Sequence, residues 1–235
     1  MGIFADDTSI FASALSYERT VKILQESLDD IQDWTDADGT KLNATKSENV
    51  VFALRNYVNI PLVLNGEAVP HVDKARYLGL IMDAKLKYKE HILKKKEQIK
   101  LKLKQMNWLI GKHSKLSLRY KVLLYKSMIR PVWAYACQLW ACLANSNIRE
   151  IETIQNIALR KIANARWYER NADIRAELGI ESMEVFISRT YVRYEERLGA
   201  HPNPEAIRLL DWAEETRRLK RRKPYELHTP DFKKV

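Results

Sequence analysis

The sequence predicts an α+β fold in which a small β-rich block with one long helix precedes an otherwise helical chain. Two acidic or polar turn signals, Asp6-Asp7 and Asn65-Gly66, are each flanked by short apolar segments of the kind that form strands. A single long helical pattern lies between these two turns. Beyond Asp83, apolar residues recur at helical spacing through most of the remaining chain.

The charge balance favours a polyanionic partner such as nucleic acid. Lysine and arginine number 40 against 30 aspartates and glutamates, which gives a formal net charge of +10. An excess of this sign attracts phosphate-rich polymers. The alternative is a basic protein whose lysines only face water, and the clustering of the charges decides between the two.

The chain lacks the sequence features of membrane and secreted proteins. No apolar run approaches the roughly 20 residues of a membrane span, and the first residues lack the basic-then-apolar order of a secretion signal. We therefore expect an intracellular protein with no membrane partner, and nucleus and cytoplasm both stay open. Cys137 and Cys142 have no neighbouring histidine, which predicts neither a disulfide partner nor a zinc site.

Residues 1–82 are predicted to form the β-rich block. Its first hairpin presents Asp6 and Asp7 at the tip, and Ser16 is a suitable N-cap for a helix that stops near Gly39. The apolar side chains of this helix are expected to cover a sheet, and they are Val21, Leu24, Leu28, Ile31 and Trp34.

The rest of this block is predicted to contain a loop, a buried strand, a hairpin and a final strand. The loop is residues 42–48, and the buried strand is Val50–Leu54. Asn65-Gly66 is a strong signal for a hairpin between residues 60–64 and 67–69. The final strand is expected over residues 76–81.

Beyond Asp83 the apolar spacing predicts helices at about 92–110, 116–129, 145–162, 171–178, 182–198 and 203–215. Pro131 should interrupt or bend the second of them. The tryptophans Trp108, Trp133, Trp140 and Trp167 are expected in the core rather than on nucleic acid, and Tyr135 is expected in the core as well. Lysines crowd the polar face of the first of these helices.

Two adjacent carboxylates at the tip of a hairpin are suited to holding hard divalent cations through oxygen ligands. In two-metal sites, cations held in this way stabilise the attacking and departing oxygens of a phosphoryl transfer. The alternative for Asp6 and Asp7 is an ordinary solvated turn, in which aspartate is common.

Three segments in this order resemble the palm of reverse transcriptases from non-LTR retrotransposons. They are Phe4-Ala5-Asp6-Asp7, Leu42-Asn43-Ala44-Thr45-Lys46-Ser47-Glu48 and Tyr77-Leu78-Gly79. Further segments are similar to the region after the palm in jockey-type elements. These include Tyr125-Lys126-Ser127-Met128-Ile129-Arg130-Pro131 and Asn164-Ala165-Arg166-Trp167-Tyr168-Glu169-Arg170-Asn171.

The resemblance implies an RNA-directed DNA polymerase, a nucleotidyltransferase that uses an RNA template and a DNA primer. Asp6 and Asp7 would bind Mg²⁺ as catalytic residues, Lys46 would lie near the departing pyrophosphate, and Tyr77-Leu78-Gly79 would form the primer grip. The resemblance also divides the chain into a partial palm at 1–82, made of a small antiparallel sheet plus one helix, and an all-helical remainder. That remainder is a thumb at 83–145, a carboxy-terminal segment at 146–216 and a basic tail at 217–235.

The lysine-rich helix and the basic tail are the predicted nucleic-acid-binding surfaces, because cations that follow a phosphate backbone fix position without reading sequence. The alternative for the lysine-rich helix is a solvated helix face. The alternative for the basic tail is a nuclear-import patch. The predicted binding residues are Lys94, Lys95, Lys96, Lys100, Lys104, Arg217, Arg218, Lys220, Arg221 and Arg222.

We expect the chain to be a carboxy-terminal fragment that is inactive alone. In the family, the fingers and the third catalytic aspartate precede the Asp6-Asp7 motif, and the aspartates after Ser16 should point to water. The acidic hairpin should then have an unpaired edge. The alternative is a basic helical protein that binds nucleic acid without catalysis. A third possibility is a purely structural helical protein. The oligomeric state is open.

Overall fold

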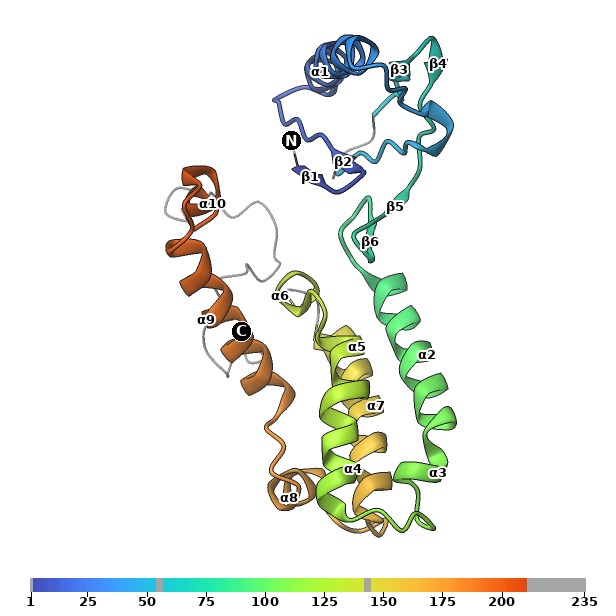
Figure 1. Ribbon diagram of the computed structural model, residues 1–235, viewed down its shortest axis with the longest axis vertical. Helices are drawn as coiled ribbons and strands as arrows, with labels where there is room; N and C mark the ends of the chain where they lie inside the picture. Colours follow the sequence, from blue (N-terminus) through green and yellow to red (C-terminus); the bar gives the residue numbers. More distant parts are fainter. Residues whose placement is uncertain (1, 54–56, 142–144, 211–235) are drawn as a thin grey trace. The chain divides into compact units, whose positions relative to one another are not determined.

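The computed structural model describes residues 2–53, 57–141 and 145–210, which fall into two compact units, Met1–Lys87 and Tyr88–Val235 (Figure 1). Every strand of the described residues lies in the first unit, as three two-stranded antiparallel sheets. The second unit is helical. The boundary falls past residue 82, where the sequence predicted the end of the β-rich block.

Helix α1 (Tyr17–Ala37) is the long helix predicted after Ser16, whose side chain caps it by accepting a hydrogen bond from the Arg19 N–H. Its inner face packs on a small apolar core, formed by Val21, Ala44, Leu62, Leu64 and Val69. Trp34 does not join this core and is 66% exposed. Its predicted place in the apolar stripe is therefore wrong, because the core does not extend along the whole helix.

The Asn65-Gly66 hairpin is confirmed, with strands β3 (Val63–Leu64) and β4 (Glu67–Ala68). Both turn residues have positive φ, 53° for Asn65 and 77° for Gly66, as a two-residue hairpin turn of this type requires. Helix α1 holds the hairpin through the Gln25 side chain, which donates to the Val63 carbonyl at 2.8 Å and accepts from the Val63 N–H at 2.9 Å.

Two strand predictions in this unit are wrong. Val50–Ala53 forms no strand, and Phe52 there is 45% exposed, while the neighbouring Asn49 makes only an isolated parallel bridge to His71. Residues 76–81 are not one strand but the middle of a hairpin, β5 (Lys74–Tyr77) and β6 (Leu80–Asp83). Apolar composition favours a strand but does not supply the partner that a strand needs.

The helical unit is built around α2 (Lys89–Gln105) and α7 (Asn145–Ala163), which pack against each other (Figure 1). The predicted apolar faces of both are confirmed as core. The buried residues of the predicted faces are Ile92, Ile99, Leu103, Met106 and Ile110 on and just after α2, and Ile148, Ile151, Ile154, Ala158 and Ile162 on α7.

Helix α4 (Leu118–Leu124) runs into a π-helical turn at Tyr125–Ile129 and then into α5 (Arg130–Ala134). Pro131 lies in the first turn of α5, where its missing N–H costs no regular α-helical bond. The predicted interruption thus takes the form of a π-turn just before the proline. Trp133 follows and is buried, as predicted.

The remaining helices are α3 (Asn107–Ile110), α6 (Cys137–Trp140), α8 (Asn171–Glu177), α9 (Met183–Gly199) and α10 (Pro204–Arg208). The last ends at Arg208, before the predicted end of its helix, and residues 211–215 lie outside the described ones. Cys137 is buried with a free thiol, and Cys142 lies outside the described residues. None of the described helices is both long and apolar enough to cross a membrane.

Candidate metal and nucleic-acid sites

The predicted acidic hairpin is confirmed. Strands β1 (Gly2–Phe4) and β2 (Asp7–Ser9) pair antiparallel, with Phe4 opposite Asp7. The chain reverses through Ala5 and Asp6, and Ala5 has a φ of 53°. Both Asp6 and Asp7 are exposed, so their carboxylates are accessible to a ligand from solvent.

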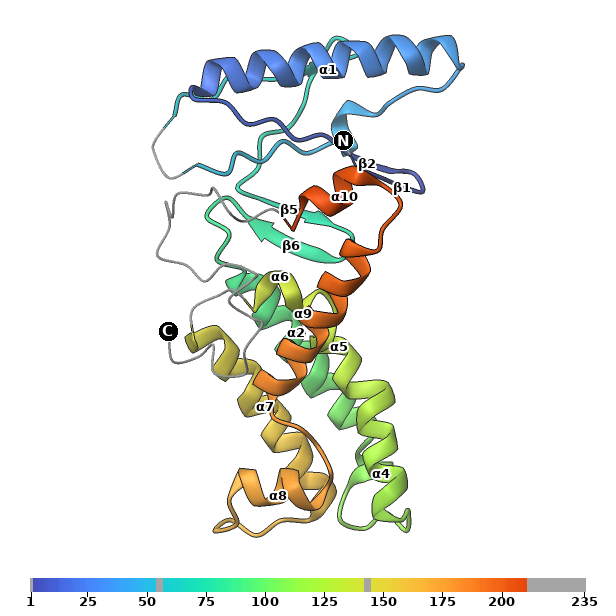
Figure 2. The same cartoon turned by 90° about the vertical axis from the view of Figure 1, so that its left-hand side faces the viewer.

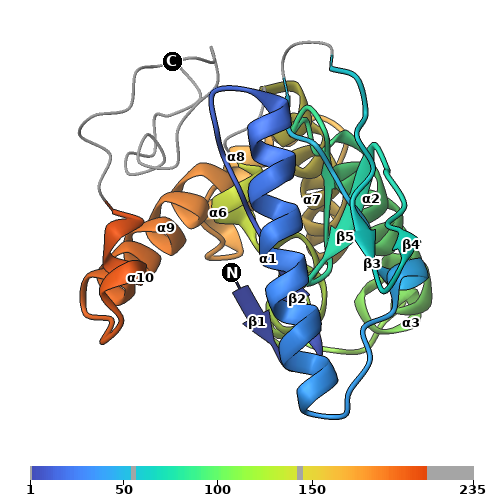
Figure 3. The same ribbon diagram turned by 90° about the horizontal axis from the view of Figure 1, so that it is seen from above.

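This hairpin pairs with no other strand of the described residues, so its edges are open, as predicted. It lies on the side of the C-terminal half of α1 (Figures 2 and 3). Three large apolar side chains on and after the hairpin are exposed, Phe4 at 64%, Phe11 at 65% and Leu15 at 99%. An open edge with exposed apolar neighbours is typical of a surface that another structure covers.

Tyr77 of the predicted primer grip lies next to the acidic hairpin. A Cβ atom placed on Gly2 would be 3.7 Å from the Tyr77 hydroxyl oxygen and 3.0 Å from Ser9 Oγ. Leu78 and Gly79 form the turn between β5 and β6, with φ of 46° and 76°. The three residues therefore belong to the tip of a hairpin, which corrects the predicted continuous strand.

Lys46 lies at the end of a short 3₁₀-helix, Ala44–Lys46, that Asn43 caps. The Asn43 side-chain oxygen accepts from the Lys46 N–H at 3.0 Å and from the Thr45 hydroxyl at 2.7 Å. The Lys46 side chain is exposed. It makes no ion pair with Asp6 or Asp7 among the interactions of the described residues, so the fold does not join these three predicted catalytic side chains directly.

The acidic hairpin offers two carboxylates to a cation. Across the described ranges, no group of three or more histidine, cysteine, aspartate or glutamate side chains is placed to hold a metal ion. Mg²⁺ is commonly bound through one or two carboxylates, with water and substrate phosphates completing its shell. Asp6 and Asp7 therefore fit as part of a ligand set.

Some lysines of α2 form no ion pair with another described residue, and others contact a carboxylate or an aromatic ring. Lys94 and Lys104 are exposed and form no ion pair with another described residue. Lys95 lies over the Tyr135 ring at 5.4 Å, and Lys100 pairs with Glu97 at 2.7 Å. Tyr135 is 50% exposed, so its predicted place in the core is wrong, and it lies where it can accept the lysine cation.

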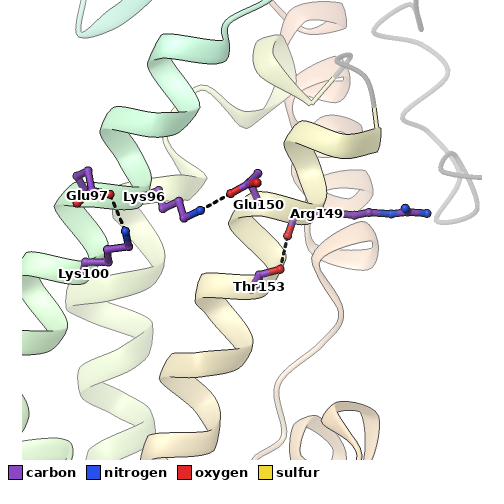
Figure 4. Close-up of polar contacts among 6 residues, drawn as sticks. All are labelled: Lys96, Glu97, Lys100, Arg149, Glu150 and Thr153. Carbon is purple, nitrogen blue, oxygen red and sulfur yellow. Dashed lines mark hydrogen bonds and ion pairs between the residues drawn. The ribbon is translucent and has the colours of Figure 1, made fainter.

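Lys96 forms an ion pair with Glu150 of α7 (Figure 4). The hydrogen bond and charge of Lys96 lower the pKa of the Glu150 carboxyl. Arg149, the next residue, is exposed and projects away from α2 (Figure 4). The pair joins the two central helices and engages one of the predicted phosphate-binding lysines. The basic tail with Arg217, Arg218, Lys220, Arg221 and Arg222 lies outside the described residues.

Two tryptophans expected in the core are on the surface instead, Trp108 at 75% exposed and Trp167 at 91%. The sequence carries a signal that could have found them. Each has a polar or charged residue directly before it, Asn107 before Trp108 and Arg166 before Trp167, whereas the buried Trp133 and Trp140 have small or apolar residues on both sides.

Comparison with curated proteins gives relatives of one kind. The chain is 34% identical over 232 residues to "RNA-directed DNA polymerase from mobile element jockey" of Drosophila melanogaster, a match that covers 95% of this chain and 25% of that protein. It is 30% identical over 229 residues to "Probable RNA-directed DNA polymerase from transposon X-element" of the same species, covering 97% of this chain and 25% of the relative.

A third relative, "Probable RNA-directed DNA polymerase from transposon BS" of Drosophila melanogaster, is 31% identical over 224 residues, or 94% of this chain and 25% of the relative. The chain thus spans about a quarter of the length of the curated relatives it matches. No protein-family model matches the sequence. No solved structure matches it either.

Proposed function

Because the sequence is homologous over nearly its whole length to part of the RNA-directed DNA polymerases of jockey-like non-LTR mobile elements, we propose that this chain supplies the metal-binding hairpin and a duplex-contacting helix of such an enzyme. In that enzyme the reaction is nucleotidyl transfer to a DNA primer on an RNA template. The first unit corresponds to part of a palm, and the helical unit to a thumb and the segment after it.

The observation that carries the proposal is the acidic hairpin within this homologous sequence. Asp6 and Asp7 are adjacent, exposed and placed at a reversal of the chain, so both can be presented to one reaction centre. We propose that they hold Mg²⁺. The bound cations would stabilise the developing charge on the attacking and departing oxygens.

Other residues of the first unit would position the substrates. Tyr77 lies next to β1, so the tip of the β5–β6 hairpin is close enough to support a primer end held at the acidic hairpin. Lys46 is exposed and its backbone is fixed by the Asn43 cap. Its ammonium group could reach a departing pyrophosphate and stabilise its charge.

In the helical unit, α2 would contact the phosphates of the template–primer duplex. Lys94 and Lys104 are the residues best suited to this, because their side chains are exposed and form no ion pair within the described structure. Contacts of this kind hold a duplex without reading its sequence, as a polymerase requires.

We further propose that the chain does not polymerise by itself. It brings two carboxylates to the hairpin and, in the described structure, no third metal-binding side chain beside them. The open edges of β1–β2 and the exposed Phe4, Phe11 and Leu15 are consistent with a surface completed by further polymerase sequence.

Primer extension on an RNA template tests this function. The reaction compares this chain, a version extended upstream through its encoding locus, and the extended version with Asp6→Asn/Asp7→Asn. A matched control is Asp30→Asn/Asp33→Asn, which removes two exposed carboxylates from α1. We expect activity only in the extended protein, lost in the hairpin variant and kept in the control. Activity in the short chain would refute its proposed inactivity, and equal activity in both variants would refute the role of the hairpin.

A second candidate function is non-catalytic nucleic-acid binding. The exposed lysines of α2 favour it, since they require no metal and no third carboxylate. It predicts that an extended protein stays inactive while duplex binding weakens steeply with salt. Binding that is weak and insensitive to salt would contradict both functions and favour a purely structural role.

A further inference from the structure

One end of the helical unit carries a hollow of about 650 Å³ between two segments far apart in the sequence. One wall is α3 with the loop that follows it, and the other is the C-terminal end of α7 (Figure 1). Trp108 and Lys112 line the first wall, and Arg160 and Lys161 line the second. None of these residues belongs to the acidic hairpin or to the exposed lysines of α2.

The first wall is held in place by close backbone contacts. The Gly111 N–H donates to the Asn107 carbonyl at 2.8 Å, and a Cβ atom on Gly111 would lie 2.4 Å from that same oxygen. Lys121 is buried, and its Nζ donates to the Gly111 carbonyl at 3.1 Å. The position of the loop that carries Lys112 is therefore fixed before any ligand arrives.

The second wall leads into a loop that Arg160 organises. Its guanidinium donates to the Glu169 carbonyl at 2.8 Å, to the Asn171 side-chain oxygen at 3.1 Å and to the Arg166 carbonyl. Within this loop the Trp167 and Tyr168 rings meet edge to face with centroids 5.8 Å apart. Arg160 thus fixes the loop that carries the Trp167–Tyr168 pair on the surface.

The charge and the exposed rings together indicate the ligand. Lys112 is exposed and Lys161 half-buried, and neither forms an ion pair within the described structure. Trp108 is 75% exposed and Trp167 is 91% exposed. Trp108 lines the hollow together with these two lysines, and Trp167 lies in the loop that Arg160 holds and that follows the second wall. Exposed rings and unpaired cations suit a ligand with both flat rings and phosphates, and an unpaired nucleic-acid strand offers both.

We propose that this aromatic and basic surface binds single-stranded nucleic acid, with bases stacked on Trp108 and Trp167 and phosphates held by Lys112 and Lys161. A duplex is a poorer match, because its bases are already stacked on one another and present no free face. Trp108 follows Lys104 of α2 by four residues, but no lysine of α2 lines the hollow. The proposal does not depend on catalysis by the acidic hairpin.

The test measures fluorescence anisotropy of a labelled oligouridine and, separately, of a labelled blunt-ended RNA–DNA duplex with the whole chain. Trp108→Ala and Trp167→Ala should each weaken oligouridine binding by about tenfold, since stacking is the interaction removed. Trp108→Phe should recover part of the loss. Trp34→Ala is the matched control, because Trp34 is also an exposed tryptophan, at 66%, but lies on α1.

The lysines give a second, independent measurement. Lys112→Gln/Lys161→Gln should make the logarithmic salt slope of oligouridine binding shallower by about 1.4, because each lysine that neutralises a phosphate of a single strand adds about 0.7 to the slope. Duplex binding should stay within about twofold of the parent in all four variants of this surface. Circular dichroism confirms that each variant is folded.

Three results would overturn the proposal. They are oligouridine binding unchanged in both alanine variants, an equal loss in the Trp34→Ala control, and an equal loss for the duplex. The first would show that bases do not stack on these two rings, and the third that the surface does not distinguish a single strand from a duplex. Loss of duplex binding in α2 variants alone would leave this proposal intact, so the two sites fail separately.

Discussion

Lys96 of α2 and Glu150 of α7 form an ion pair between the two central helices of the helical unit (Figure 4). Both side chains remain partly exposed, 26% for Lys96 and 46% for Glu150. A pair at such a site stabilises the fold only modestly. Its main consequence is that Lys96, like Lys100, is engaged within the protein, whereas Lys94 and Lys104 are available to a ligand.

Lys94 and Lys104 should contribute more to duplex binding than Lys96 and Lys100. Lys94→Gln/Lys104→Gln should make the logarithmic salt slope of duplex binding shallower by about 1.8, because each phosphate contact contributes about 0.9. Lys96→Gln/Lys100→Gln removes the same charge from the same helix and should change the slope by less than about 0.9. Anisotropy titrations at several salt concentrations measure both. Equal changes in the two variants would show that the intramolecular pairs do not matter for binding.

Glu150→Gln is expected to increase affinity for a duplex. The substitution removes the acceptor that engages Lys96, and that lysine becomes available to a phosphate. The salt slope should steepen by up to about 0.9 for one added contact. Glu177→Gln, which removes an exposed carboxylate from α8, controls for the change in net charge. If Glu177→Gln has the same effect, release of Lys96 is not the cause.

Arg130→Lys should destabilise the helical unit by about 1–3 kcal/mol, although it keeps the charge. Arg130 pairs with Glu181 at 3.6 Å, and its guanidinium lies 5.4 Å from the Tyr125 ring and 5.2 Å from the Phe186 ring. A lysine ammonium cannot cover two rings and bind a carboxylate with one planar group. Urea unfolding measures the loss.

The matched control is Arg208→Lys, which alters an exposed arginine pair with Glu205. We expect a change below about 0.5 kcal/mol there. A loss for Arg130→Lys as small as that of the control would mean that the Arg130 cluster contributes only charge.

His91 predicts a pH dependence of stability. Burial first, and then the charges of Lys95 and Lys94, lower its pKa from 6.5 to about 4. Between these values the unfolded chain takes up a proton that the folded chain does not, so the free energy of unfolding falls as the pH drops from 6.5 towards 4. The loss attributable to His91 is at most about 3 kcal/mol.

His91→Gln should flatten the stability profile between about pH 6.5 and 5, measured by urea unfolding at each pH. His113→Gln changes an exposed histidine of the α3–α4 loop and should leave the profile as it is. A profile that is unchanged in His91→Gln would assign the pH dependence to other groups.

Periodicity and turn chemistry were sufficient for much of the fold. The apolar spacing of α1, α2 and α7 fixes which face of each helix is buried, and Asn65-Gly66 fixes a hairpin through its positive φ values. The two wrong strand predictions have a common cause. Val50–Ala53 and the segment 76–81 have strand composition, but pairing depends on distant partners and on Leu78 adopting a φ of 46°. Leucine gives no sign of a turn of that kind.

The candidate site was predictable in part. The position of Asp6 and Asp7 on a hairpin follows from local sequence, whereas the closeness of Tyr77 to Gly2 is a tertiary contact that no local pattern contains. The lysines of α2 are exposed, half-buried or paired according to what α7 and the loop after α5 place beside them. Trp108 and Trp167 were assigned to the core from residue type, and their polar neighbours were the better guide.

The central claim is that this chain carries a working part of an RNA-directed DNA polymerase. The most direct measurement is primer extension by the jockey polymerase of Drosophila melanogaster with its homologous quarter replaced by this chain. We predict that the chimaera extends a primer on an RNA template, that Asp6→Asn/Asp7→Asn abolishes extension, and that Asp30→Asn/Asp33→Asn does not. A folded chimaera that binds duplex but never extends a primer, or one that extends equally well without both hairpin carboxylates, would contradict the claim.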